Sequence, residues 1–212
     1  MKKIIILLFL FLLPIICYLT YNLTERKEEY ILAIGDETAN IIELSNNGNV
    51  IYNNDVVNED YRISDILDIL KYNKEKKTAD KEISLHRLLK KTDKVIISIG
   101  MNDIYYKLND DTKDIYTYIN NMIDNYEEIL KNINKYDYQK VYVLGYYNIT
   151  NSNNDLFVYT NYKLNNITKK YNYTYIELNK ILNNNQKYYQ KSNSFYLNKE
   201  GYSQIYKLIV EK

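Results

Sequence analysis

Apolar runs alternate with amphipathic stretches along the chain, and the two patterns have different periods. Five short runs are rich in β-branched and aromatic residues, which favour strands. Three of these runs are apolar throughout, as is typical of parallel strands that are covered on both faces. The sequence therefore predicts strands at residues 30–34, 50–57, 94–99, 140–144 and 173–178.

Helical periodicity fills most of the intervals between these strands. Apolar residues recur at spacings of three and four, which marks one buried face of an α-helix. The predicted helices cover residues 63–70, 83–89, 112–133, 155–171 and 199–210, and the Asn-rich segments 148–154 and 183–193 are predicted to be loops. This alternation predicts an α/β fold, a three-layer αβα domain with a five-stranded parallel sheet in the order 2-1-3-4-5.

The first residues have a different pattern, which is typical of a membrane segment. Lys2 and Lys3 precede residues 4–21, a stretch that carries no charge. As a helix this stretch is about 27 Å long, enough to reach across the hydrocarbon core of a bilayer. The two lysines favour a cytoplasmic amino terminus, so the sequence predicts a single-pass protein of the cell membrane with an extracytoplasmic domain.

Two other interpretations compete with an uncleaved anchor. A cleaved signal peptide needs small residues around its cleavage site, and residues 17–22 lack them. Cys17 follows an apolar run as in a bacterial lipoprotein signal, but the bulky Ile16 stands where that signal has a small residue. We therefore expect an anchor at residues 1–21, a juxtamembrane linker at 22–29 and one domain at 30–212.

Composition and charge narrow the classes of function. The chain has 28 basic and 27 acidic residues, so its formal net charge of +1 provides no field that would attract nucleic acid. Cys17 is the single cysteine, which leaves the predicted domain without a disulfide or a thiolate metal site. The 26 tyrosines are not assigned a function as a group.

Polar residues follow the ends of two predicted strands. The runs are ILAIG at residues 31–35 and VIISIG at residues 95–100, and the polar residues and glycine at their ends are Asp36, Glu37, Gly100, Asn102 and Asp103. The carboxyl ends of parallel strands meet at one edge of a sheet, where α/β proteins build their sites. We therefore expect these residues to converge there.

This arrangement resembles the first and third sequence blocks of the SGNH/GDSL hydrolases. The resemblance implies a flavodoxin-like fold and hydrolysis of acyl esters by a Ser-His-Asp triad. In that family a Gly-Asp-Ser turn presents the nucleophile, and the matching position here is Glu37. A Gly-x-Asn-Asp turn supplies an oxyanion-hole amide, and Gly100, Asn102 and Asp103 match it. Asn102 is equally well interpreted as a turn residue that caps the following segment.

The other blocks depart from the family's pattern. The second block normally contributes a glycine, and residues 58–65 contain none. The last block has the form Asp-x-x-His, and its alignment on Asn198 and Gly201 places Asn193 at the aspartate and Tyr196 at the histidine. A phenol with a pKa near 10 is a poor base at neutral pH. An asparagine cannot stabilise a cationic base as a carboxylate does.

The single histidine, His86, falls on a predicted helix far from this edge. All three triad positions have thus changed, which favours a non-catalytic domain that binds an envelope glycan or an acylated polymer, the ligand class that the resemblance implies. The alternatives are an ester hydrolase or deacetylase with a nonstandard site around Glu37, Asn102 and Tyr196, and a scaffold for a membrane partner.

No cofactor is expected. Convergence of Asp36, Glu37 and Asp103 would suit a hard cation such as Ca²⁺ or Mg²⁺. Carboxylates at strand ends commonly cap the next helix instead, so no metal site is predicted.

Overall fold

The computed structural model describes residues 28–42, 49–72, 76–78, 81–110, 114–150, 152–191 and 194–211. The predicted anchor at residues 4–21, together with Cys17 and Asn193, lies outside the described residues. Within the described part of the chain, no helix is both long enough and apolar enough to cross a membrane.

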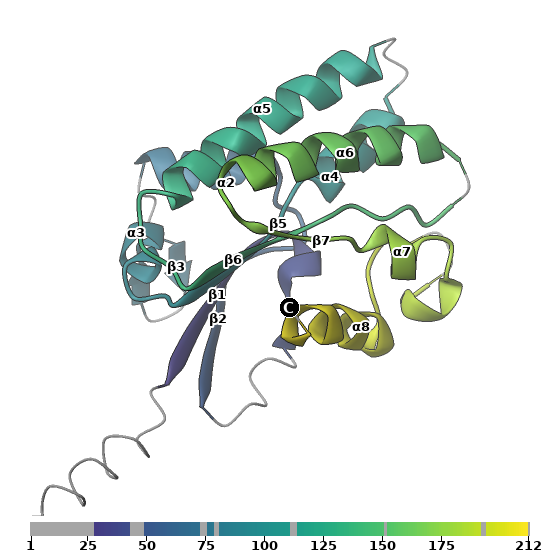
Figure 1. The fold of residues 1–212 in the computed structure, drawn as a ribbon. Coiled ribbons are helices and arrows are strands. Elements are labelled where there is room, and N and C mark those ends of the chain that lie inside the picture. The colour runs from purple at the N-terminus through teal and green to yellow at the C-terminus, as the bar shows by residue number, and fades with distance from the viewer. Residues whose placement is uncertain are drawn as a thin grey trace, which may run out of the picture.

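A five-stranded parallel sheet forms the centre of the structure (Figure 1). Its strands are β1 (Glu29–Gly35), β2 (Val50–Val57), β5 (Lys94–Ser98), β6 (Lys140–Leu144) and β7 (Thr174–Ile176). They lie in the order β2-β1-β5-β6-β7, and each neighbouring pair is parallel. Counted along the chain this is the order 2-1-3-4-5, so the predicted α/β sheet is confirmed.

The central strands are apolar because helices cover both of their faces. Leu32 of β1 and Ile96 and Ile97 of β5 are fully buried. Burial of a side chain of this size contributes roughly 1.5–3 kcal/mol to folding. The edge strand β2 is instead mostly exposed or partly buried, with Ile51 among its exposed residues and Val56 as its one buried residue, because it pairs with a neighbour on one side, β1.

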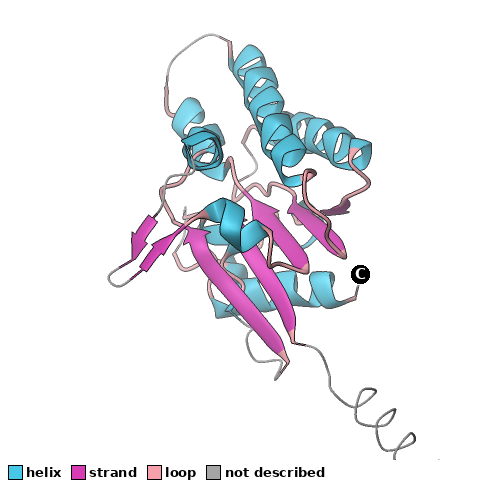
Figure 2. Cartoon of the chain, turned by 90° about the vertical axis from the view of Figure 1, so that its left-hand side faces the viewer, coloured by secondary structure: helices cyan, strands magenta, loops and turns pink. Residues whose placement is uncertain are grey.

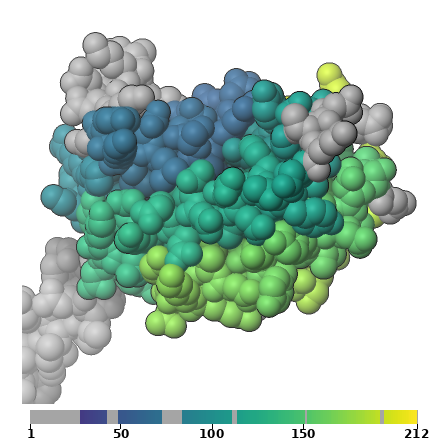
Figure 3. Space-filling model, turned by 90° about the horizontal axis from the view of Figure 1, so that it is seen from above, coloured from purple at the N-terminus to yellow at the C-terminus, as the bar shows by residue number. Residues whose placement is uncertain are grey.

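Two helical layers enclose the sheet, as Figures 1 and 2 show. One face carries α2 (Ile63–Tyr72), α4 (Met101–Leu108), α5 (Ile115–Ile133) and α6 (Asn154–Lys170). Of these helices, α2, α5 and α6 lie side by side on the surface seen from above in Figure 3. The opposite face carries α8 (Lys199–Val210) and the 3-10 turn η1 (Glu37–Ala39).

Several short elements differ from the sequence predictions. Residue 83 ends β4 (Lys81–Ile83), which pairs antiparallel with β3 (Lys76–Thr78), and only α3 (Leu85–Leu89) of the segment 83–89 is helical. The helix α4 begins directly after Gly100, ahead of the predicted helix 112–133. The short helices α7 (Asn179–Leu182) and η3 (Gln186–Tyr188) follow β7. Elements of three to eight residues are too short for periodicity to identify them.

Candidate functional site

The two strand ends that carry the sequence motifs meet at the carboxyl edge of the sheet, and glycines allow their close approach. The pairing of β1 with β5 extends to Gly35 and Ser98. Gly35 has a φ of +132°, and a Cβ there would lie 1.6 Å from the Ser98 carbonyl oxygen. Gly100 has a φ of +108°, and a Cβ there would lie 2.6 Å from the Tyr146 hydroxyl. Both motif glycines are therefore required by the backbone.

Asp36 joins the two motifs through hydrogen bonds and is only 2% exposed. Its carboxylate accepts hydrogen bonds from the backbone N–H groups of Thr38 at 3.1 Å and Met101 at 3.3 Å, and from the Ser98 hydroxyl at 3.2 Å. Burial raises the pKa of Asp36 to about 7, although these donors act in the opposite direction. Asp36 thus caps η1 and fastens it to the start of α4.

Asn102 and Asp103 fasten this edge to the segment that follows β2. Asn102 Nδ2 donates to the carbonyl oxygens of Glu59 at 2.6 Å and Tyr61 at 2.9 Å. An amide nitrogen has two hydrogens, so both are used on these carbonyls and neither points to an oxyanion. The Asp103 carboxylate accepts a hydrogen bond from the N–H of Ile63, the first residue of α2, at 3.1 Å, and burial raises its pKa.

Glu37, at the position of the family's nucleophile, is bound to the last helix. The Tyr202 hydroxyl of α8 lies 2.9 Å from Glu37 Oε1 and 3.0 Å from the Glu37 carbonyl oxygen. Burial is the main cause that raises the pKa of Tyr202, and the charge of Glu37 adds to it. The phenol is therefore a proton donor to Glu37, and the pair links η1 to α8.

Tyr196, at the position of the family's base, lies at the same edge. Burial is the main cause that raises the pKa of its phenol, and the charges of Glu59, Asp60 and Glu37 raise this pKa further. A phenol with a raised pKa stays protonated at neutral pH, so it donates a hydrogen bond and does not act as a general base. The position of the orienting aspartate, Asn193, lies outside the described residues.

Aromatic side chains that the sequence analysis did not assign hold the segment before α8. The buried Tyr147 hydroxyl donates to the carbonyl oxygen of Phe195 at 2.7 Å and lies 3.3 Å from the Thr38 hydroxyl. The Phe195 ring stacks on Tyr105 of α4, with centroids 4.8 Å apart and an interplanar angle of 7°. The signal for Tyr147 was its position, because it follows the carboxyl end of β6 and so reaches the edge where β1 and β5 end.

The polar groups at this edge are bonded to one another, which limits the chemistry available. The hydrogen bond from Tyr202 withdraws charge from Glu37 Oε1 and so weakens this carboxylate as a nucleophile. Asp36 and Asp103 accept from backbone N–H groups and so act as caps. Among the described residues, no group of three or more His, Cys, Asp or Glu side chains is placed to hold a metal ion. What this edge offers a ligand is the half-buried phenol of Tyr196 beside carboxylates.

His86 lies on α3, away from this edge. Its Nε2 is 3.0 Å from the Leu70 carbonyl oxygen, and its Nδ1 contacts the Tyr136 hydroxyl. A carbonyl oxygen only accepts, so Nε2 donates in the contact with Leu70. The histidine therefore joins α2 and α3 to the segment before β6 and takes no part in the candidate site.

The three layers, the strand order of the sheet, and the Gly-Asp and Gly-x-Asn-Asp turns at one edge are those of an SGNH/GDSL hydrolase-like fold. Solved structures support this class. The chain is similar to the acetylxylan esterase Axe2 from Geobacillus stearothermophilus, with a TM-score of 0.64, 11% identity, and coverage of 87% of this chain and 94% of that chain. It is also similar to an alpha/beta hydrolase enzyme from the metagenome of Lake Arreo, Spain (TM-score 0.63, 12% identity, coverage 87% and 94%). A GDSL-like lipase from Parabacteroides merdae matches with a TM-score of 0.59, 11% identity, and coverage of 87% and 95%.

These likenesses establish the fold alone, because the identities are low. No protein-family profile matches the chain, and the search of curated proteins finds no match. Variants of Axe2 with alanine in place of a serine and of an aspartate are described as catalytic mutants. In this chain Glu37 stands at the position that the motif alignment gives to the nucleophilic serine.

Proposed function

We propose that the protein is a non-catalytic SGNH/GDSL hydrolase-like domain that binds an acylated glycan of the cell envelope. The observation that carries this proposal is the hydrogen bond between Tyr202 and Glu37, which engages one oxygen of the carboxylate at the nucleophile position. A serine esterase needs a nucleophile whose proton is taken by a neighbouring base. Here the base position holds Tyr196, a phenol that carries its own proton at neutral pH.

The oxyanion side of the site supports the same proposal. Hydrolysis of an ester requires hydrogen-bond donors directed at the oxygen that becomes negatively charged. Both hydrogens of Asn102 Nδ2 are held by the carbonyl oxygens of Glu59 and Tyr61. The hydrogen bonds at this edge therefore stabilise the loops of the fold instead of a transition state.

The ligand class rests on the structural likeness and on the chemistry of the edge. Axe2 is described as an acetylxylan esterase, which makes acetylated polysaccharides the first ligands to test. In this chain the Tyr196 ring packs against the Phe195 ring, with centroids 4.7 Å apart, and lies near the carboxylates of Glu59 and Asp60. An aromatic face beside hydrogen-bond acceptors suits a neutral sugar, whose C–H face is apolar and whose hydroxyls donate.

The location is part of the proposal. We propose that residues 4–21 cross the cell membrane once and that the domain lies on the extracytoplasmic side, because Lys2 and Lys3 precede the uncharged segment. In intact cells an added protease should then remove the domain. A domain that is degraded only after the cells are lysed would contradict this orientation.

Calorimetric titration of the purified full-length protein, in detergent micelles, tests the binding. We expect acetylated xylo-oligosaccharides to bind and the Tyr196→Ala variant to bind them about tenfold more weakly, which corresponds to about 1.4 kcal/mol. Tyr206→Ala removes a half-buried tyrosine from α8 and serves as the matched control. An intact protein that binds none of a panel of acetylated and deacetylated envelope glycans would contradict the proposal and favour a scaffold.

A further inference from the structure

A pocket of about 360 Å³ lies at the opposite edge of the sheet, where β6 and β7 begin. It is formed by the connection from α5 to β6, residues 134–139, and by the turn from α6 to β7, residues 171–173. Small-molecule sites in proteins start at about this volume, roughly 300 Å³. Because the strands are parallel, this edge is the far end of the sheet from Glu37 and Tyr196.

Four tyrosines line this pocket in two pairs. Tyr171 and Tyr173 stack with their centroids 5.8 Å apart and an interplanar angle of 27°. Tyr136 and Tyr138 lie 6.2 Å apart at 39°. All four are half-buried, so their rings combine contact with the core and a surface towards the pocket.

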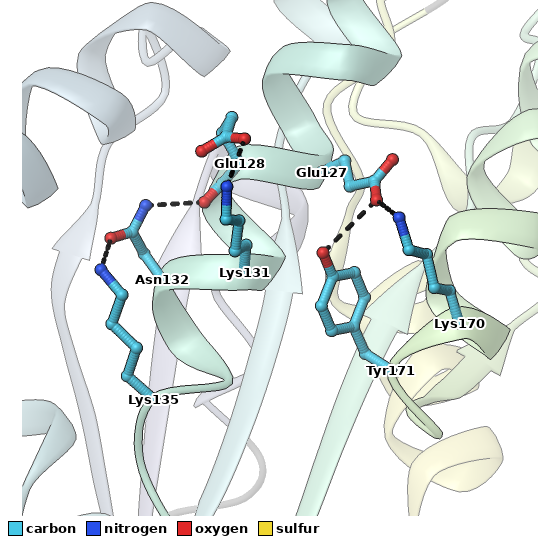
Figure 4. Close-up of polar contacts among 7 residues, drawn as sticks. All are labelled: Glu127, Glu128, Lys131, Asn132, Lys135, Lys170 and Tyr171. Carbon is cyan, nitrogen blue, oxygen red and sulfur yellow. Dashed lines mark hydrogen bonds and ion pairs between the residues drawn. The ribbon is translucent and has the colours of Figure 1, made fainter.

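Hydrogen bonds hold three of the four rings in place. The Tyr171 hydroxyl donates to Glu127 Oε1 at 3.4 Å, and the same oxygen accepts from Lys170, as Figure 4 shows. The Tyr173 hydroxyl donates to Asn134 Oδ1 at 3.2 Å. The Tyr136 hydroxyl forms a hydrogen bond with His86 Nδ1. Rings that are fixed before a ligand arrives lose little conformational entropy on binding, which is the advantage of a preorganised site.

Two polar side chains of the lining are not used by the fold. Asn172 and Asp137 are exposed, and neither side chain makes a hydrogen bond with another described residue. Asn172 sits at a φ of +58°, in the left-handed region, so the turn itself brings its amide to this position. The amide can donate and accept, while the carboxylate accepts, which together match the hydroxyl groups of a sugar.

The charge of the pocket lining makes an anionic ligand a poor fit. Asp137 and Lys140 are its two ionisable side chains apart from the tyrosines, and their charges cancel. Phosphate and sulfate recognition uses several arginines or lysines. Aromatic faces with an amide and a carboxylate suit a neutral ligand that has an apolar face and hydroxyl edges.

We infer that this pocket binds a neutral sugar unit of a glycan. The tyrosine rings contact the C–H face of the sugar, and Asn172 and Asp137 bond its hydroxyls. The inference does not depend on the function proposed for the carboxyl edge, because no residue is shared between the two places. A chain with both sites would bind a glycan at two edges of one sheet.

The test is titration of the full-length protein in detergent with xylotetraose, cellotetraose and chitotetraose, followed by calorimetry. Asn172→Gly keeps the left-handed backbone and removes only the side-chain amide, so the fold should be retained. We expect it to weaken the binding of at least one tetrasaccharide about tenfold. Asn184→Gly, at a φ of +54° and outside the pocket lining, is the matched control and should bind as the unaltered protein does.

A second variant, Tyr173→Ala, should weaken binding further, because it removes one of the stacked rings. Tyr196→Ala, at the other edge, separates this inference from the proposed function, because binding that persists in this variant and is weakened by Asn172→Gly belongs to the pocket. Sugar binding that responds to Tyr196→Ala but not to Asn172→Gly would overturn the inference and leave the proposed function standing. The inference would also be overturned if none of the three tetrasaccharides bound, or if the protein bound only vesicles that contain anionic lipid.

Discussion

Removal of the Tyr202 hydroxyl tests the structural role of the nucleophile position. This hydroxyl lies 2.9 Å from Glu37 Oε1 and joins η1 to α8. Tyr202→Phe deletes the donor and keeps the ring, so the packing of α8 should not change. Glu37 then loses the partner that holds its carboxylate at the surface of the sheet edge.

The size of the effect follows from the chemistry of the bond. A hydrogen bond to a charged group contributes about 1.5–3 kcal/mol to stability. Both residues are only partly buried, so water replaces part of the lost interaction and the lower end of that range applies. We expect Tyr202→Phe to lower the free energy of unfolding by about 1.5 kcal/mol. For a domain of this size, that loss lowers the Tm by roughly 3–6 °C.

Urea denaturation of the single and double variants of Tyr202→Phe and Glu37→Ala isolates the bond. The two changes should be non-additive by about 1 kcal/mol or more, since each removes the same interaction. Tyr206→Phe on the same helix is the control, because its hydroxyl makes no hydrogen bond with the described residues. Additive effects of the two variants, or an equal loss in the control, would refute the proposed role of Glu37 as a tether.

Three further predictions concern backbone, core and pH. Gly100→Ala should lower the free energy of unfolding by about 2 kcal/mol or more, since its φ is +108° and a Cβ would lie 2.6 Å from the Tyr146 hydroxyl; unchanged denaturation would contradict that geometry. Tyr126→Phe should raise the stability by about 1 kcal/mol, because the buried Tyr126 hydroxyl has no hydrogen-bond partner in the described structure; a loss of stability on denaturation would mean that the hydroxyl is bonded. Burial raises the pKa of Asp36 to about 7 from 3.8, so the folded state binds more protons than the unfolded state between these values and stability should fall as the pH rises from 4 to 8, by up to about 4 kcal/mol. Asp36→Asn should flatten this dependence in denaturation series, and an unchanged slope would refute the assignment.

The order of the sheet could be predicted from the sequence because its central strands are continuous apolar runs. Runs such as Val95–Ile97 are recognisable without tertiary information, and the connection rules for parallel strands leave few arrangements. The convergence of the two motifs at the carboxyl edge could also be predicted, because glycine and polar residues follow both apolar runs. A chain that passes as close to its neighbour as Gly35 does to the Ser98 carbonyl leaves no room for a Cβ.

The hydrogen-bond partners of the side chains at the carboxyl edge of the sheet could not be predicted, because they depend on contacts between distant segments. Glu37 and Tyr202 are 165 residues apart, and nothing in the local pattern pairs them. A partial signal was present, since Tyr202 follows Gly201, the residue used to align the last block. Asn102 was open to two interpretations in sequence, and its bonds to Glu59 and Tyr61 became visible only once the loop after β2 was placed.

The tyrosines that line the pocket could not be singled out from the sequence. Their high number obscured the four that share a pocket, since Tyr136, Tyr138, Tyr171 and Tyr173 come from two separate turns. Only the parallel pairing of β6 with β7 brings those turns together. The pocket at that edge is therefore a product of the topology.

Hydrolysis of acyl esters by the purified full-length protein distinguishes a non-catalytic domain from an ester hydrolase. The substrates are p-nitrophenyl acetate and acetylated xylo-oligosaccharides, and Glu37→Ala and Tyr196→Phe are measured beside the unaltered protein. With Tyr202 bonded to the Glu37 carboxylate and a protonated phenol at the base position, we expect a rate within a few-fold of buffer that neither variant changes. A saturable rate far above buffer that either variant abolishes would contradict it, because the site would then be a rewired ester hydrolase.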